Sequence, residues 1–156
     1  MRVLHLPQSS LPWVIGGKEI YCHSLARDLA AAGIENRIAI HQNEAQEEPL
    51  GNFSLDGIDI SVLPPLPVSE RRKILFTRSY DQLPGFEDLL DEFQPDLVHF
   101  HDQKGGASMS HLRAVKARGC RVVLTYHSPE QGCLQTELKR EGGIPCDGAV
   151  RPRRCT

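Results

Sequence analysis

The fold is decided by the first forty residues, which read MRVLHLPQSS LPWVIGGKEI YCHSLARDLA AAGIENRIAI. Residues 3–6 form a short apolar run that ends at a proline, which is typical of a buried strand. After Gly16 and Gly17, apolar residues recur at helical spacing: Ile20, Tyr21, Leu25, Leu29 and Ala32. Gly33 supplies a helix stop signal, and residues 37–40 form the next apolar run. This order of strand, glycine loop, helix and strand predicts a βαβ unit.

The same alternation continues along the chain. Within residues 53–63, apolar positions alternate with others on both sides of an Asp-Gly pair, which predicts a β-hairpin. We expect further strands at 97–100 and 121–126, and helices over three stretches: 70–76, 86–93, and from Gly105-Gly106 to Gly119. This pattern predicts an α/β fold with a Rossmann-like, doubly wound, mostly parallel sheet and flanking helices. It also divides the chain into a domain over 1–128 and a cysteine-containing tail over 129–156.

Composition excludes several classes of protein. The 156 residues are 40% hydrophobic and 24% charged, and the formal net charge of -2 gives no basic field for binding nucleic acid. No apolar run is long enough to span a bilayer, and the N-terminus does not have the pattern of a signal peptide. We therefore expect a cytoplasmic protein with at most peripheral contact at the inner face of the membrane.

Five cysteines, an odd number, argue against a disulfide framework. Cys22 and Cys120 lie in apolar segments, where they are expected to be small core residues. Cys133, Cys146 and Cys155 could offer thiols to a zinc ion, but no fourth ligand is evident, so free or buried thiols are favoured. A cluster of basic side chains near residue 73 is interpreted as a solvent-exposed face, rather than as a surface that contacts an acidic acceptor or a membrane. It consists of Arg71, Arg72, Lys73 and Arg78.

Polar residues follow three of the expected strands, and parallel sheets bind ligands at the carboxyl ends of their strands. These residues are Gly16-Gly17, His101-Asp102 and His127-Ser128. A helix that starts after paired glycines can bind an anion through its backbone N–H groups, although the glycines could equally end a loop. A dehydrogenase-type nucleotide site is disfavoured, because the three-glycine fingerprint is missing and residues 41–43 carry no acidic side chain.

His99 and His101 lie two apart at the end of an expected strand, so they point to the same face. We expect His99 to pack beneath the sheet edge and His101 to reach a ligand, beside Asp102. The pair could also hold a metal, but two ligands do not make a site. A purely structural role is the alternative for both histidines, as it is for Thr125, His127 and Ser128.

Four motifs, in order and in register, resemble the N-terminal half of family 4 glycosyltransferases. The first is MRVLHL at 1–6 with GGKE at 16–19, and the second is PDLVHFH at 95–101. The third is VVLTYHS at 122–128, in which Ser128 stands where many members have Asp. The fourth is the cysteine-bearing tail, which is similar to an insert found in some members.

The resemblance implies one half of a GT-B architecture, in which two Rossmann-like domains face each other across a cleft. The N-terminal domain mainly binds the acceptor, and the C-terminal domain mainly binds the nucleotide-diphosphate sugar donor. It further implies a hexosyltransferase-type enzyme that retains anomeric configuration, has no tightly bound cofactor and needs no metal. Motifs of the family's C-terminal half are not found among the 156 residues, so we expect a truncated tail and a chain that is inactive on its own. The alternative is a non-catalytic binding or assembly module with the same fold.

Carried over by position, the resemblance implies that His101 is the catalytic residue and contacts the transferred sugar. Donor or acceptor contacts are expected from Gly16, Gly17, Lys18, Glu19, Asp102, Thr125, His127 and Ser128. Further acceptor contacts are expected within residues 42–84. The donor sugar, the acceptor and the linkage are not indicated by these motifs.

Overall fold

The computed structural model describes residues 1–42, 51–67, 80–102, 108–128, 138–139 and 143–147. The chain divides into two compact units, Met1–Thr125 and Tyr126–Thr156. Several expected features lie outside the described residues. These are the helix at 70–76 with its basic residues, the Gly105-Gly106 pair, Cys133 and Cys155.

A six-stranded sheet in the order β3-β4-β2-β1-β5-β6 forms the centre of the first unit. Its strands are β1 (Arg2–Leu6), β2 (Glu35–His41), β3 (Phe53–Leu55), β4 (Ile58–Leu63), β5 (Leu97–His101) and β6 (Arg121–Thr125). Every neighbouring pair is parallel except β3 with β4. The β3–β4 hairpin turns at Asp56 and Gly57, which have φ angles of 49° and 79°. Positive φ at both central residues is what a tight hairpin turn requires, so the hairpin prediction is confirmed.

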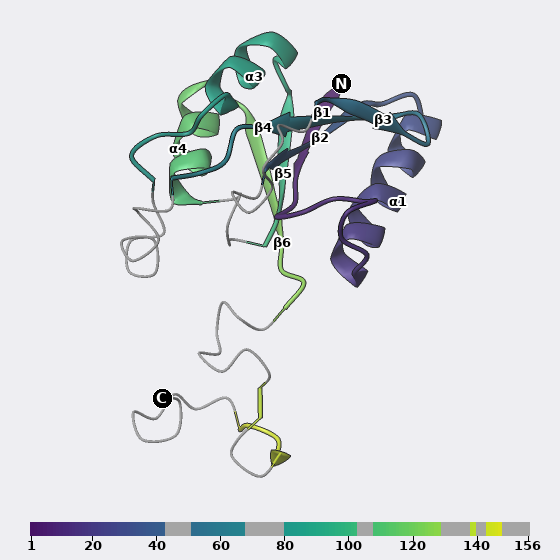
Figure 1. Ribbon diagram of the computed structural model, residues 1–156, viewed down its shortest axis with the longest axis vertical. Coiled ribbons are helices and arrows are strands. Elements are labelled where there is room, and N and C mark those ends of the chain that lie inside the picture. The colour runs from purple at the N-terminus through teal and green to yellow at the C-terminus, as the bar shows by residue number, and fades with distance from the viewer. Residues whose placement is uncertain (43–50, 68–79, 103–107, 129–137, 140–142, 148–156) are drawn as a thin grey trace. The chain divides into compact units, whose positions relative to one another are not determined.

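Helices cover both faces of this sheet, as Figure 1 shows. The described helices are α1 (Gly17–Ala31), α3 (Phe86–Phe93) and α4 (Met109–Ala117). One core cluster joins α3 and α4 to β1 and β5, and its largest members include Phe86, Leu4 and Leu6. A second cluster joins Cys22 and Ala26 of α1 to four isoleucines, Ile38, Ile40, Ile58 and Ile60. The predicted α/β Rossmann-like fold is therefore confirmed.

Helix α1 buries a different face from the one its apolar residues predict. Its buried residues are Glu19, Cys22, His23 and Ala26, whereas Ile20 and Tyr21 are 49% and 45% exposed. The apolar residues at helical spacing predicted the helix correctly but do not mark its buried face, since Leu25 and Leu29 are only half-buried. The strands already fill this layer with isoleucines, so small side chains on α1 let the helix approach the sheet closely.

The strand order places β1 at the centre, with β2 on one side and β5 on the other. The chain moves outward from β1 through β2 and β4, and then returns to β5 on the opposite side. Such a reversal is a topological switch point, where the loops that follow the two central strands diverge and leave a crevice. Here those loops are the one that leads to Gly16 and the one that begins at Asp102.

The second unit is described at Tyr126–Ser128, 138–139 and 143–147. Within it, Lys139 and Pro145 form an isolated antiparallel bridge, and the Cys146 N–H donates to the Leu138 carbonyl at 2.8 Å. His127 and Ser128, both half-buried, belong to this unit.

Candidate functional site

A polar cluster lies at the carboxyl ends of β1 and β5. It is formed by Ser9, Lys18, Glu19 and Asp102. The Lys18 ammonium lies 3.9 Å from the Asp102 carboxylate and 4.0 Å from the Glu19 carboxylate. Ser9, in the loop after β1, donates its hydroxyl proton to Glu19 Oε1 at 2.5 Å. Glu19 and Asp102 are buried, at 6% and 7% exposed, so this edge holds two largely enclosed carboxylates around one ammonium, with one more negative than positive charge.

Glu19 also controls the start of helix α1. A Cβ built on Gly16 would lie 2.6 Å from Glu19 Oε2, so the carboxylate folds back over the first turn of the helix. Gly16 supplies no side-chain cap, and the carboxylate instead lies where the helix dipole favours negative charge. An anion from the chain itself therefore already lies next to the position where the glycines were expected to bind a phosphate.

Asp102 has a backbone conformation that few side chains adopt. Its φ is 67°, in the left-handed region that Asp and Asn tolerate better than other non-glycine residues. This conformation occurs at the first residue after β5, where its N–H still bonds to the Thr125 carbonyl at 2.9 Å. The chain therefore turns sharply at Asp102, with its carboxylate near Lys18.

A layer of histidines lies on the α1 face of the sheet. His5 of β1 pairs in register with His99 of β5, and His101 follows two residues later on the same face. The His5 and His101 side chains are fully buried, and His99 is 7% exposed. Tyr21 of α1 meets the His101 ring edge-on, with 5.9 Å between the ring centroids.

These positions reverse the expected exposure of the two β5 histidines. His101, which we expected to reach a ligand, is completely enclosed, because α1 covers that end of the strand. His99 is slightly more exposed and bonds to the Thr125 hydroxyl at 2.8 Å. The Thr125 side chain thus has a partner on its own sheet. The catalytic role of His101 stays a prediction, and direct contact with a sugar would require its ring to be uncovered.

Asn36 fixes the tautomer of His5. Its amide nitrogen donates to the Ile34 carbonyl, so its oxygen faces His5 Nε2, which must donate across 3.2 Å. His5 Nδ1 therefore carries a lone pair, and that lone pair faces His101 Nε2 at 3.3 Å. Burial lowers the pKa of His5 to about 4, and burial raises the pKa of the nearby Cys22 thiol to about 12.

A second histidine pair links the end of β2 to the start of α4. Ser108 donates its backbone N–H to His111 Nδ1 at 3.1 Å, so His111 carries its proton on Nε2. That proton bonds to His41 Nε2 across 3.0 Å, and His41 Nδ1 donates to the Pro64 carbonyl at 2.7 Å. Burial lowers the pKa of both rings, and that of His111 falls well below its usual value.

A family model described as Glycosyltransferase Family 4 matches residues 15–145, which is more than half of the chain. The chain belongs to glycosyltransferase family 4. The resemblance of its motifs to the N-terminal half of that family is thereby confirmed. No curated protein matches the chain. None of the described helices is long and apolar enough to cross a membrane.

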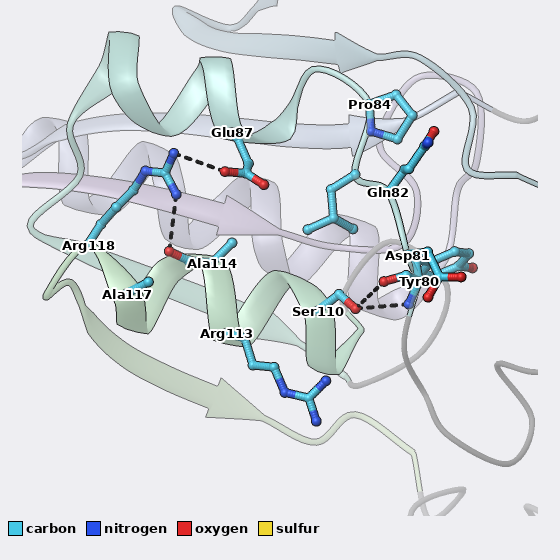
Figure 2. A pocket seen from close by; sticks show the side chains of 11 residues that line it. Tyr80, Asp81, Gln82, Pro84, Glu87, Ser110, Arg113, Ala114, Ala117 and Arg118 are labelled. Carbon is cyan, nitrogen blue, oxygen red and sulfur yellow. Dashed lines mark hydrogen bonds and ion pairs between the residues drawn. The ribbon is translucent and has the colours of Figure 1, made fainter.

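This family 4 domain also has a cavity of about 690 Å³ along α3 and α4, which Figure 2 shows. One end is formed by Tyr80 and Ser110, where the Ser110 hydroxyl donates to the Tyr80 carbonyl at 2.6 Å. At the other end Arg118 bonds to Glu87 and Asp91. The cavity is bordered by residues 80–84, inside the stretch where acceptor contacts were expected.

Sequence reasoning found Lys18, Glu19 and Asp102 but missed Ser9 and His5. Ser9 lies in a loop without a motif, so no signal in the sequence indicated its bond to Glu19. His5 had a usable signal, because it is the one titratable residue within the apolar run 3–6. A buried ionisable side chain in a strand next to a His-x-His strand indicates a shared polar layer.

Proposed function

We propose that this chain is the acceptor-side half of a retaining glycosyltransferase that moves a hexosyl group from a nucleotide-diphosphate sugar. The observation that carries the proposal is the Lys18–Glu19–Asp102 cluster at the switch point of the sheet. Open α/β sheets bind their ligands at that point. Family membership supports sugar transfer as the chemistry.

The charges of the cluster favour an acceptor over a diphosphate. Carboxylates accept hydrogen bonds from hydroxyl groups, and a bond to a charged acceptor is stronger than one between neutral groups. A diphosphate, in contrast, would be repelled by Glu19, which lies over the start of α1. We therefore assign acceptor hydroxyl groups to Glu19 and Asp102, and the donor diphosphate to a second Rossmann-like domain.

Cleft closure between the two domains would orient the acceptor oxygen toward the anomeric carbon. The bond from that carbon to the diphosphate breaks as the new glycosidic bond forms, and the proton of the acceptor hydroxyl passes to the departing diphosphate. We propose that this transfer needs no metal and occurs in the cytoplasm. His127 and Ser128 are proposed as further cleft residues.

The test is transfer from a panel of nucleotide-sugar donors, with released nucleoside diphosphate as the readout. The assay compares the 156-residue chain alone with the same chain joined to whatever coding sequence follows it in its gene, called the joined protein. We expect release only from the joined protein. Absence of release with every donor and acceptor tested would overturn the enzyme proposal.

The alternative function is a binding or assembly module without turnover. The specific observation that favours it is the cavity beside α3 and α4, whose lining includes none of Ser9, Lys18, Glu19 and Asp102. Saturable binding of a glycan to the joined protein, with no nucleoside diphosphate released, would support this alternative.

A further inference from the structure

Three buried side chains from three different elements converge beneath the polar cluster. His5 comes from β1, His101 from β5 and Cys22 from α1. Their ligand atoms all lie within 4.8 Å of one another. His5 and His101 are fully buried, and Cys22 is 1% exposed. Two imidazoles and one thiol enclosed in this way form a ligand set for a soft or borderline transition metal.

The separation of the two imidazole nitrogens fits a tetrahedral ion. Zinc–nitrogen bonds of about 2.0–2.1 Å at a tetrahedral angle place two nitrogens roughly 3.3–3.4 Å apart. His5 Nδ1 and His101 Nε2 lie 3.3 Å apart. The two rings therefore already stand at the spacing that a shared ion requires.

The surroundings of His5 match those of a metal ligand. A ligating histidine usually donates its other ring N–H to an oxygen, which holds the ring and leaves a lone pair for the ion. Asn36 accepts this bond from His5 Nε2, and its own amide is fixed by the Ile34 carbonyl. The lone pair on His5 Nδ1 consequently points at the other nitrogen of the proposed set.

We propose that His5, Cys22 and His101 bind one zinc-type divalent ion. As the ion binds, the Cys22 thiol releases its proton to the buffer and the His101 proton moves from Nε2, where it faces His5 Nδ1, to Nδ1. The ion then accepts an electron pair from each of the three ligands. The ion would connect α1, which carries Lys18 and Glu19, to β1 and to β5, which ends directly before Asp102. Its role is to stabilise this part of the domain, because a site formed only on folding adds its binding free energy to that of folding.

The test uses Co²⁺ as a spectroscopic substitute for Zn²⁺ in the full 156-residue chain. Cys133, Cys146 and Cys155 are first replaced by serine, so that tail thiols cannot bind the ion. Since the proposed ligands are buried, the chain is refolded with Co²⁺ present. We expect one Co²⁺ per chain and a near-ultraviolet sulfur-to-cobalt charge-transfer band.

Two variants in that background locate the site. Cys22→Ser should abolish the charge-transfer band, whereas Cys120→Ser should keep it, because Cys120 is buried in the other core cluster. His5→Asn should weaken binding at least tenfold. Circular dichroism of the metal-free variants checks that each one folds.

A thermal measurement gives a second readout. Zn²⁺ at about 100 times its dissociation constant should raise the Tm by roughly 5–10 °C, and this rise should be lost in Cys22→Ser. The proposal is overturned if no charge-transfer band forms in the tail-cysteine background. It is equally overturned if the band survives Cys22→Ser.

Discussion

Gly16 and Gly17 are neighbours, but the structure gives them different reasons to be glycine. A side chain on Gly16 would meet the Glu19 carboxylate, whereas nothing lies within 4 Å of the position that a Gly17 Cβ would occupy. Gly16 has an extended backbone, with φ of -137° and ψ of 168°, which alanine adopts without strain. The only penalty for a Gly16 side chain is therefore the displacement of Glu19.

Gly16→Ala should lower the free energy of unfolding by about 1 kcal/mol, because it moves the Glu19 carboxylate off the helix start and disturbs its bond to Ser9. Gly17→Ala is the matched control. It should be neutral or stabilising by up to about 1 kcal/mol, since alanine favours the helix. Urea denaturation of both variants measures the difference. Equal effects would contradict this account of Gly16.

Asp102→Asn tests the proposed acceptor contact with little change of shape, because Asn also tolerates the left-handed backbone of Asp102. Loss of a charged hydrogen bond of about 1.5–3 kcal/mol should raise the acceptor KM roughly 10- to 100-fold in the joined protein. Asp59→Asn, at an exposed position on β4, is the control. An unchanged acceptor KM would exclude Asp102 from acceptor binding.

At the scale of elements, helix α4 begins with a cap that uses a histidine in place of the usual acidic or amide partner. The Ser108 hydroxyl accepts from the Ser110 N–H at 3.2 Å, and the His111 ring accepts from the Ser108 N–H. Both bonds satisfy backbone donors that the first turn of a helix leaves free. The same His111 ring bonds to His41, so this cap also connects α4 to β2.

Ser108→Ala should therefore lower the free energy of unfolding by about 1–2 kcal/mol, toward the upper end of the range for helix caps. Ser24→Ala, on the exposed face of α1, should leave stability unchanged or slightly raised, because alanine is the better helix former. The two variants are compared by chemical denaturation. A Ser108→Ala protein as stable as the unchanged chain would show that the cap contributes nothing.

The sequence predicted the positions of the helices and strands more accurately than it predicted the face that each of them buries. Apolar runs located β1, β5 and β6, and the stripe of α3 from Phe86 to Phe93 was also correct. The buried face of α1 could not be predicted in this way, because it is lined by small and polar side chains. What decides that face is the filling of the opposite layer by isoleucines, which depends on strand neighbours rather than on the helix itself.

At the scale of the whole molecule, the sequence predicted only those features of the candidate site that follow from the order of the strands. The carboxyl-edge rule, which depends only on strand order, placed the Gly16-Gly17 loop and Asp102 at one edge, and Lys18, directly after those glycines, does contact Asp102. It could not show how deeply each side chain at that edge is buried: Glu19 and Asp102 are 6% and 7% exposed, and His101 is fully buried. His101 is enclosed because Tyr21 and α1 pack over it, and that contact depends on the rotation of the helix.

The His41–His111 pair makes the stability of the molecule depend on pH. Its neighbours are the Pro64 carbonyl, Ser108 and the rings of Tyr80 and Phe86, and both folded pKa values lie below the usual 6.5. The unfolded chain therefore binds protons first as the pH falls. The stabilisation is fully present above pH 6.5 and declines as the pH falls below it, toward the folded pKa values.

Between about pH 6.5 and 5.5, each of these histidines should reduce the free energy of unfolding by up to about 1.4 kcal/mol per pH unit. Urea denaturation at several pH values gives the slope. His41→Gln should make that slope shallower, because it removes one of the protonation steps, to which His5 and His111 also contribute. An unchanged slope in this variant would show that the histidine pair is not responsible.

The two edges of the sheet differ in a way that bears on handling the protein. One edge ends in β3, which has three residues and runs antiparallel to the rest. At the other edge, β6 pairs with β5 alone among the described strands, and Val123 and Leu124 are 42% and 37% exposed. Unpaired backbone beside apolar side chains is a template for another strand, so self-association is expected to start at β6.

Val123→Lys should accordingly reduce the increase of light scattering with protein concentration, because charge on an edge strand opposes pairing. Ile144→Lys replaces an apolar side chain that is even more exposed, at 60%, but lies outside the strands of the sheet, so it should have little effect. Among the described strands, a short hairpin forms one edge of the sheet and β6 forms the other, so we expect further strands to add beside β6. Colloidal behaviour of the purified chain would then depend on the five residues of β6.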